Sequence, residues 1–257
     1  MAARFATIIL ALIALAAPAH ATPTLPENLY YSISWNGLSL GRIRVTSSET
    51  ATTYSMLVDT KSKGVAATFS PFRTLAEVQG TKTNGTYLPT RYHSRSEKSD
   101  EGGDHSTLIT YDTKGAITER TLVPPNTDPA WRPIVPLKKA QTATDPITAL
   151  IAMRARLSTN ASQGVTDTIM RSYDGKRLAE LKATIIEDDE AADRSTPVIV
   201  TRITRNPIDG YTQKELKKHA EGDPDFIVWF TNDQHLMPER LELQLMLGTI
   251  VATRESK

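Results

Sequence analysis

The segment YSISWNGLSLGRIRV, residues 31–45, contains two strand patterns joined by a turn signal. Apolar side chains alternate with serines up to Trp35, which is typical of a half-buried β-strand. Asn36-Gly37 follows at once, and Asn-Gly is the strongest short-range signal for a hairpin. A second alternating run returns over residues 38–45. The segment therefore predicts an antiparallel β-hairpin.

Further strand patterns follow along the chain at the spacing of a meander. Asp174-Gly175 predicts another hairpin. The strands are expected at residues 54–58, 74–80, 87–94, 106–111, 116–122, 165–172, 177–186, 197–204, 226–230, 238–247 and 251–253. Short strands joined by turns predict an antiparallel sheet. The polar, lysine-rich stretch 211–220 is interpreted as a short surface helix.

One segment has the period of a helix. Asp145 suits an N-cap, and Pro146 suits the first helical position, where its missing N–H has no helical partner to lose. An apolar stripe follows at helical spacing and consists of Ile147, Leu150, Ile151 and Leu157. The pattern predicts a helix over about 145–158 with its stripe buried against the sheet.

The proline-rich segment 123–136 cannot be a regular helix or a central strand, and we interpret it as an ordered crossover packed over the sheet. Together these features predict a mainly β fold. We expect a curled antiparallel sheet, either a half-barrel or an open barrel, around one α-helix. Whether the sheet encloses a cavity or a filled core is left open by the sequence.

The composition excludes several classes of site. The chain has 257 residues, of which 39% are hydrophobic and 23% are charged, a balance typical of globular proteins. Lys and Arg total 30 against 29 Asp and Glu, so we expect no basic surface for nucleic acid. Cysteine is absent, which excludes disulfides, thiolate metal sites and a cysteine nucleophile.

Residues 1–21 are interpreted as a secretory signal peptide. Arg4 provides the positive charge, the apolar run from Phe5 to Ala17 is too short to span a bilayer comfortably, and Ala19-His20-Ala21 fits a cleavage site. We expect residues 22–257 to form a single antiparallel β domain that is periplasmic or secreted. It is expected not to span a membrane after signal cleavage.

Sequence signatures of catalysis are missing: the chain has no G-x-S-x-G, S-x-x-K, phosphate-loop or H-E-x-x-H pattern. His93, Asp100, Glu101, Asp104 and His105 could supply ligands for zinc or another divalent metal. A solvated charged loop between two strands explains them better, because their spacing matches no recognised metal motif. The sequence therefore predicts no catalytic residue, no metal site and no cofactor.

Three aromatic residues in turn or crossover segments are candidates for the mouth of an apolar pocket. Phe69 and Phe72 flank a Ser-Pro turn, and Trp131 lies in the proline-rich crossover. We predict that these three residues bind an apolar ligand. The alternative is that they close the open end of the sheet.

Four motifs in order resemble the exported bacterial family called domain of unknown function three-one-zero-eight. They are Tyr31-Ser32-Ile33-Ser34-Trp35-Asn36-Gly37, Asp145-Pro146-Ile147-Thr148-Ala149-Leu150 with Arg154, Tyr173-Asp174-Gly175-Lys176-Arg177, and Val228-Trp229-Phe230-Thr231-Asn232-Asp233 with Pro238. The resemblance implies an exported β protein and provides no catalytic residues. The expected architecture is also similar to that of periplasmic lipoprotein carriers, in which a half-barrel sheet wraps a helix and shelters acyl chains.

These observations favour a non-enzymatic envelope protein that binds an apolar ligand such as lipid, because a curled sheet can enclose a cavity. A first alternative is a periplasmic protein-interaction or structural envelope protein that presents a sheet edge or the crossover to a partner. A second alternative is a metal-dependent hydrolase that uses the region from His93 to His105.

Overall fold

A computed structural model describes residues 28–69, 71–98, 104–162, 166–192, 195–222, 226–233, 235–245 and 247–255. The side chains of residues 65, 69, 98, 158–162 and 192 fall outside that description. The predicted signal peptide, residues 1–21, also lies outside the described residues.

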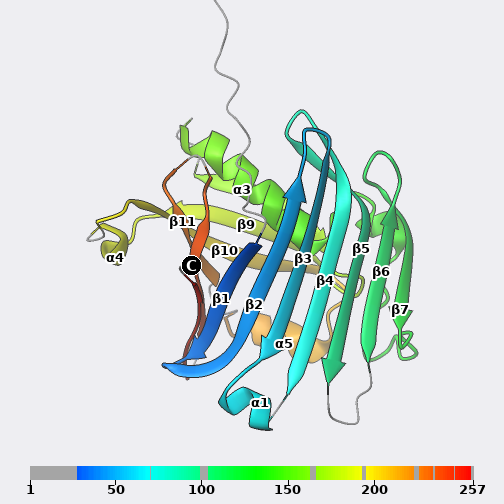
Figure 1. Ribbon diagram of the computed structural model, residues 1–257. Coiled ribbons are helices and arrows are strands. Elements are labelled where there is room, and N and C mark those ends of the chain that lie inside the picture. The colour runs from blue at the N-terminus through cyan, green and yellow to red at the C-terminus, as the bar shows by residue number, and fades with distance from the viewer. Residues whose placement is uncertain are drawn as a thin grey trace, which may run out of the picture.

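The described chain forms one open sheet of thirteen strands (Figure 1). Every pair of neighbouring strands is antiparallel. The strands are β1 (Asn28–Trp35), β2 (Leu38–Glu49), β3 (Thr53–Ser62), β4 (Phe72–Thr83), β5 (Thr86–Lys98), β6 (His105–Tyr111), β7 (Ile117–Val123), β8 (Asp167–Tyr173), β9 (Leu178–Ile186), β10 (Val198–Asp209), β11 (Phe226–Thr231), β12 (Pro238–Leu245) and β13 (Gly248–Arg254). Each strand expected from the sequence coincides with one of these, so the predicted antiparallel sheet is confirmed.

The turn after β1 shows why the hairpin prediction succeeds. Asn36 and Gly37 both have positive φ, at 47° and 83°. A type I′ turn needs positive φ at both central residues, and Asn-Gly accepts that conformation at low cost. The chain then returns with Trp35 opposite Leu38.

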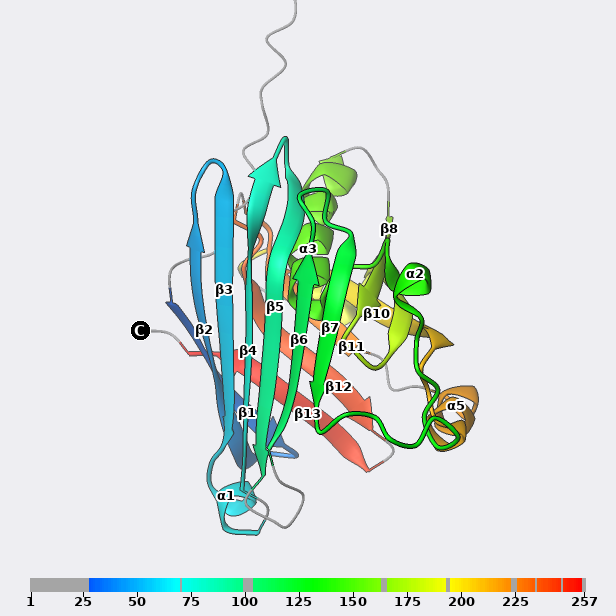
Figure 2. The same ribbon diagram turned by 90° about the vertical axis from the view of Figure 1, so that its right-hand side faces the viewer.

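The order of the strands divides the sheet into two halves. It runs β7-β6-β5-β4-β3-β2-β1-β13-β12-β11-β10-β9-β8, so β1 pairs with β13 in the middle. The two free ends are β7 and β8, which are consecutive in the chain. The segment between them begins with the proline-rich crossover and continues through α2 (Leu137–Ala140) and α3 (Pro146–Ser162). In Figure 2, α3 lies between the strands β2 to β7 and the strands β10 to β13, which run across them.

α3 begins where the sequence predicts and runs a little further. Asp145 Oδ1 accepts a hydrogen bond from the Thr148 backbone N–H at 2.8 Å, which caps the first turn. The helix extends to Ser162 rather than to about residue 158. Three members of the predicted stripe are buried, namely Ile147, Ile151 and Leu157, whereas Leu150 is 44% exposed. The predicted arrangement of a sheet around one main helix is confirmed.

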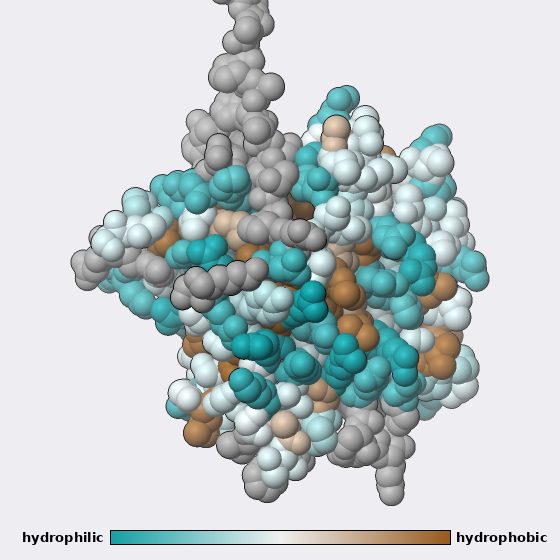
Figure 3. Space-filling view, in the orientation of Figure 1, coloured by the Kyte–Doolittle hydropathy of each residue, from teal (hydrophilic) through white to brown (hydrophobic). Residues whose placement is uncertain are grey.

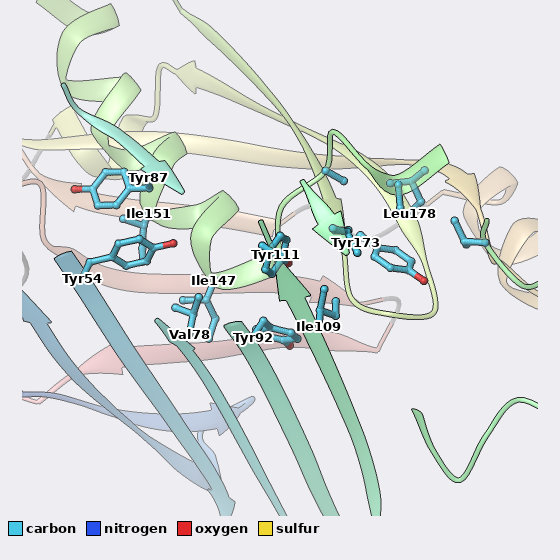
Figure 4. Close-up of a cluster of buried hydrophobic side chains, with 14 residues drawn as sticks. Tyr54, Val78, Tyr87, Tyr92, Ile109, Tyr111, Ile147, Ile151, Tyr173 and Leu178 are labelled. Carbon is cyan, nitrogen blue, oxygen red and sulfur yellow. The ribbon is translucent and has the colours of Figure 1, made fainter. Parts of the chain in front are cut away.

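A tyrosine-rich core fills the space between α3 and strands β3 to β6 (Figure 4). Tyr54 and Tyr87 meet edge to face with ring centroids 5.1 Å apart. The Tyr54 hydroxyl and Thr148 Oγ1 of α3 are 2.8 Å apart, in hydrogen-bonding contact. The helix is therefore fixed to this half of the sheet by apolar packing and by the contact between Tyr54 and Thr148.

The two free ends of the sheet approach each other through side chains. Gly175, in the turn between β8 and β9, has φ +92°, and a Cβ there would overlap Thr107 of β6. Arg120 of β7 donates a hydrogen bond to the Tyr173 hydroxyl of β8. The turn thus packs against the opposite end of the sheet without adding a strand pair.

The remaining helices are short. They are α1 (Val65–Phe69), α4 (Asp189–Ala192) and α5 (Gln213–Ala220). α5 confirms the surface helix predicted over 211–220, and a capping box between Thr212 and Glu215 begins it. Among the described residues, no helix combines the length and apolarity needed to cross a bilayer. On the face of the molecule in Figure 3, hydrophilic residues predominate and the hydrophobic areas are small.

Candidate apolar ligand site

A cavity of about 220 Å³ lies between α3 and the two halves of the sheet. Its described lining consists almost entirely of apolar side chains. β1, β2 and β3 contribute Leu29, Tyr31, Ile43, Val45, Met56 and Val58; α3 contributes Ile147, Leu150, Ile151, Met153, Arg154 and Leu157; β9 to β12 contribute Ala183, Ile203, Phe226, Val228, Phe230, Pro238 and Leu241. The cavity therefore brings together three parts of the chain that are far apart in sequence.

The alternation of each strand places these side chains on one face. Successive side chains of a strand point to opposite sides of a sheet, so residues two apart share a face. Ile43 and Val45 are such a pair, and Val45 lies directly opposite both Leu29 of β1 and Val58 of β3. The cross-strand neighbours form a continuous apolar wall. The same alternation places Val228 of β11 opposite Leu241 of β12 in the second wall.

The size and chemistry of the cavity suit a hydrocarbon group. An apolar cavity of about 150 Å³ stays dry and binds benzene. This one is larger, and Leu150, on its helical wall, keeps 44% of its surface exposed. Water gains few hydrogen bonds from such a lining, whereas an apolar chain replaces exposed apolar surface with contacts. The arrangement can bind an apolar ligand, and its lining contains no recognisable nucleophile and base pair among the described residues.

One charged residue interrupts the apolar lining. Arg154 of α3 is 4% exposed, and its Nη1 donates a hydrogen bond to the carbonyl oxygen of His235 at 3.3 Å. Burial lowers the pKa of this guanidinium, while the nearby Tyr87, Glu49 and Tyr31 act in the opposite direction. Arginine keeps its charge in proteins despite such a shift, so the cavity contains a buried cation.

A small polar pocket adjoins the cavity at Arg154. The two share Met56, Ile151 and Arg154, and the polar pocket adds Ser47, Ser48, Glu49, Tyr54, Ser55 and Tyr87. Glu49 is held there by Lys82, which forms a short ion pair with it, and by the Tyr87 hydroxyl, which donates to Oε1 at 2.9 Å. The cavity thus has an apolar body and one polar end.

A second hollow, of about 210 Å³, lies beside the crossover. Its lining mixes cations with prolines and short apolar side chains. Arg120 donates hydrogen bonds to the Tyr173 hydroxyl and to the carbonyl oxygen of Val135, and Arg132 to Glu215 and the carbonyl oxygen of Gly210. Since both guanidinium groups are used to connect elements of the fold, we regard the apolar cavity as the better candidate site.

The three aromatic residues predicted to bind ligand lie elsewhere. Phe72 begins β4 and is half-buried, and its backbone N–H donates to Ser62 Oγ at 3.0 Å. Trp131 is 63% exposed between β7 and α2, with the Arg132 guanidinium 5.1 Å from its ring centroid. Neither Phe72 nor Trp131 is among the described lining residues of the cavity. The Phe69 side chain lies outside the description, so a ligand-binding role for these residues stays a prediction.

The sequence contains one signal for this cavity. Arg154 lies four residues after Leu150 and three before Leu157, so it occupies the apolar stripe itself. A cation inside an apolar helical stripe indicates a buried charge beside an apolar surface, which is a more specific signal than exposed aromatic residues.

The residues considered for a metal site are not brought together. His105 lies opposite Ser96 and His93 opposite Leu108, so the two imidazoles are three positions apart and face opposite sides of the sheet. Asp104 pairs with Arg95. Asp100 and Glu101 lie outside the described residues. Across the described part of the chain, no three His, Asp or Glu side chains are grouped as metal ligands.

Comparison with known proteins places both the fold and the family. No curated protein matches the chain. A crystal structure of a beta-barrel-like protein of domain of unknown function DUF1849 from Brucella abortus matches with a TM-score of 0.53 and 11% identity, over 92% of this chain and 98% of that chain. At this identity the likeness shows the fold alone. The family model for DUF3108, a protein family of unknown function, matches residues 30–255. The chain thus belongs to the DUF3108 family.

Proposed function

We propose that this protein is a non-enzymatic binder of an apolar ligand, such as a lipid, and takes the hydrocarbon part of that ligand into the cavity beside α3. The observation that carries the proposal is the cavity of about 220 Å³ with its continuous apolar walls. Ligand pockets are typically concave and mostly apolar, with a few polar groups that set orientation, and this cavity has that composition.

The proposal includes an exported compartment. The pattern of residues 1–21, a positive charge, an apolar run and a small-residue site, supports export to the periplasm or beyond. In that setting the protein would shelter a hydrocarbon chain from water. The test is the N-terminal residue of the protein recovered from its native host: Thr22 supports export with cleavage, and Met1 contradicts it.

Ligand binding can be tested by blocking the cavity. Val58 of β3 lines it, whereas its neighbour Leu57 does not and is 38% exposed. Val58→Trp should fill the space and weaken binding of a fluorescent fatty acid by more than about tenfold. Leu57→Trp, the matched control on the same strand, should bind as the wild type does. Circular dichroism and thermal melting verify that both variants fold. No binding by the wild type, or equal binding by both variants, would contradict the proposal.

A second candidate function is an interaction with another envelope protein. The crossover and the end of β7 leave three large apolar side chains exposed: Val123 at 52%, Trp131 at 63% and Ile134 at 45%. Such residues can mark a contact surface. If this is their role, Trp131→Ala should abolish capture of a specific envelope protein while fatty-acid binding is unchanged. Recovery of the same proteins by both forms would contradict it.

A further inference from the structure

We infer that the second hollow, beside the crossover, is a separate binding site for a compact organic anion. The carboxylate or phosphate of that ligand is bound by Arg120, and Lys176 adds a second positive charge beside it. The second hollow shares no described lining residue with the apolar cavity, so this site is independent of the proposed function.

The described lining of the second hollow carries three cations and no acid. The cations come from different elements: Arg120 from β7, Arg132 from the crossover and Lys176 from the turn between β8 and β9. Cations that converge on one concave site from separate elements attract an anion more strongly than a single surface charge does, because their fields add there.

Arg132 brings no net charge to the second hollow. It forms an ion pair with Glu215, which also pairs with Arg177, and Arg177 pairs in turn with Asp174. Two guanidinium groups and two carboxylates therefore cancel within one network. The positive charge that remains at the second hollow comes from the other two lining cations.

Arg120 is bonded only to neutral groups. It lies opposite Ile109 of β6, which is fully buried, so it projects from the inner face of the sheet. Its Nη1 donates to the Tyr173 hydroxyl and, at 3.1 Å, to the carbonyl oxygen of Val135. A guanidinium has five N–H donors, and within the described part of the chain those of Nε and Nη2 have no acceptor. These donors suit the oxygens of a carboxylate or a phosphate.

Lys176 is held beside Arg120 by the turn. Its backbone N–H donates to Asp174 Oδ1 at 2.8 Å, and its carbonyl oxygen lies against Gly210. The acid next to Gly210, Asp209, is paired with Lys139 at 2.7 Å. Among the described residues, Lys176 is in no ion pair, so its charge is also available to an incoming anion.

The other walls of the second hollow are apolar and favour a compact ligand. The volume of about 210 Å³ is below the roughly 300 Å³ at which drug-sized pockets begin. A small ring or a short branched group fits this space better than a long alkyl chain does. The apolar lining residues are Leu122, Pro125, Pro133, Ile134 and Val135.

The test uses probes with one phenyl ring and different heads: benzoate, phenyl phosphate, benzamide and benzylamine. Titrations of the purified protein at neutral pH and low salt are followed by its backbone amide NMR signals. Both anions should bind with a Kd below about 1 mM, benzamide at least about tenfold more weakly, and benzylamine not at all. The largest shifts should occur at Val135 and Gly175. Inorganic phosphate should bind more weakly than phenyl phosphate, because it has no apolar part.

Three results would overturn the inference. They are equal affinity for benzoate and benzamide, equal affinity for inorganic phosphate and phenyl phosphate, and shifts centred away from the crossover. Val58→Trp, which fills the apolar cavity, should bind benzoate as the wild type does. Loss of benzoate binding in that variant would place the anion in the apolar cavity instead, so the two sites are distinguished.

Variants assign the anion preference to the two cations. Arg120→Met should weaken phenyl phosphate binding at least about tenfold, and Arg120→Lys, which keeps the charge without the planar fork, should weaken it less. Lys176→Met leaves the hydrogen bonds of Arg120 in place, should weaken binding severalfold and decides the case in which Arg120→Met does not fold. Lys138→Met is the matched control, because Lys138 is an exposed lysine of α2 outside the described lining. Unchanged affinity in Lys176→Met, or in a folded Arg120→Met, would contradict the inference.

Discussion

Asp145 is both the N-cap of α3 and a buried carboxyl group. It caps α3 through the Thr148 N–H, and it is fully buried. Burial raises the pKa of its carboxyl from 3.8 to about 6, and hydrogen bonds from Thr148 only partly oppose that rise. Because the pKa is higher in the folded state, the folded protein binds this proton more tightly than the unfolded chain does. The resulting stabilisation is complete below about pH 4 and is lost as the pH rises through 6.

Asp145→Asn should reveal this contribution, since asparagine is also a good N-cap and cannot ionise. A rise of two pKa units corresponds to about 3 kcal/mol. The free energy of unfolding of the variant, relative to wild type, should therefore increase by about 3 kcal/mol between pH 3 and pH 7. Urea denaturation across this range measures it. A difference that stays constant with pH would show that Asp145 remains ionised in the fold.

At this scale the sequence predicts the features that depend on adjacent residues. The cap at Asp145 and the turn at Asn36-Gly37 follow from local backbone chemistry, and both are present. The ligand site is different, because it depends on which side chains meet across the fold. Exposed aromatic residues such as Trp131 suggest a pocket mouth, but the cavity is lined mainly by buried and half-buried apolar residues of ordinary strand and helix patterns.

Among the elements, α5 is fixed to the molecule mainly by one carboxylate. Glu215 accepts hydrogen bonds from Arg132 of the crossover and from Arg177 of the turn before β9, and it completes the capping box with Thr212. Burial alone would raise the pKa of Glu215, but the hydrogen bonds from Arg132, Thr212 and Arg177 outweigh it and lower the pKa to about 2. The stabilisation is therefore present above about pH 4.5 and is lost as the pH falls toward 2.

Glu215→Ala should lower the free energy of unfolding by about 2 kcal/mol at pH 7, a value reduced for solvent screening because the side chain is partly exposed. Glu221→Ala is the control. The Glu221 side chain is 66% exposed, and its Oε1 lies 3.9 Å from Lys217 Nζ. Its removal should change the free energy of unfolding by less than about 0.5 kcal/mol. Urea denaturation at pH 7 and pH 3 measures both variants. The cost of Glu215→Ala should shrink at pH 3; an equal cost at both values would argue against the ionised network.

Strands and helices whose signals lie within a few neighbouring residues can be predicted from the sequence. β1 and β2 have a clear alternation around an Asn-Gly turn, and α3 has a clear helical period after an N-cap. Their types and approximate bounds therefore follow from the sequence. β10 is harder, because the expected strand 197–204 continues to Asp209 through Pro207. The pairing with β9 shifts register between Pro207 and Asp209. A proline is tolerated at such an irregularity, and only the partner strand reveals it.

For the whole molecule, the decisive contact is the pairing of β1 with β13. It joins two series of hairpins into one sheet, and no periodicity predicts it because the strands lie at opposite ends of the described chain. The cavity exists only because of this pairing: Ile43 on one wall and Val228 on the other are 185 positions apart in sequence. The sequence leaves open whether the sheet encloses a hollow or a filled core, and the structure contains both. The tyrosine-rich core and the cavity lie next to each other and share Ile147 and Ile151 of α3.

Because the cavity is formed by both halves of the sheet and α3, a bound ligand should stabilise these parts together. A ligand at one hundred times its Kd adds about 2.7 kcal/mol to the free energy of unfolding, which corresponds to an increase in Tm of roughly 5–10 °C for a chain of this size. Hydrogen exchange with and without dodecanoate should show slower exchange in β2, β11 and α3 at once. β7 and α5, which contribute no described residue to the cavity, should be much less affected. Val58→Trp should lose the increase in Tm and the protection together. Protection that centres on β7 and the crossover would instead place the ligand in the second hollow, beside Arg120 and Arg132.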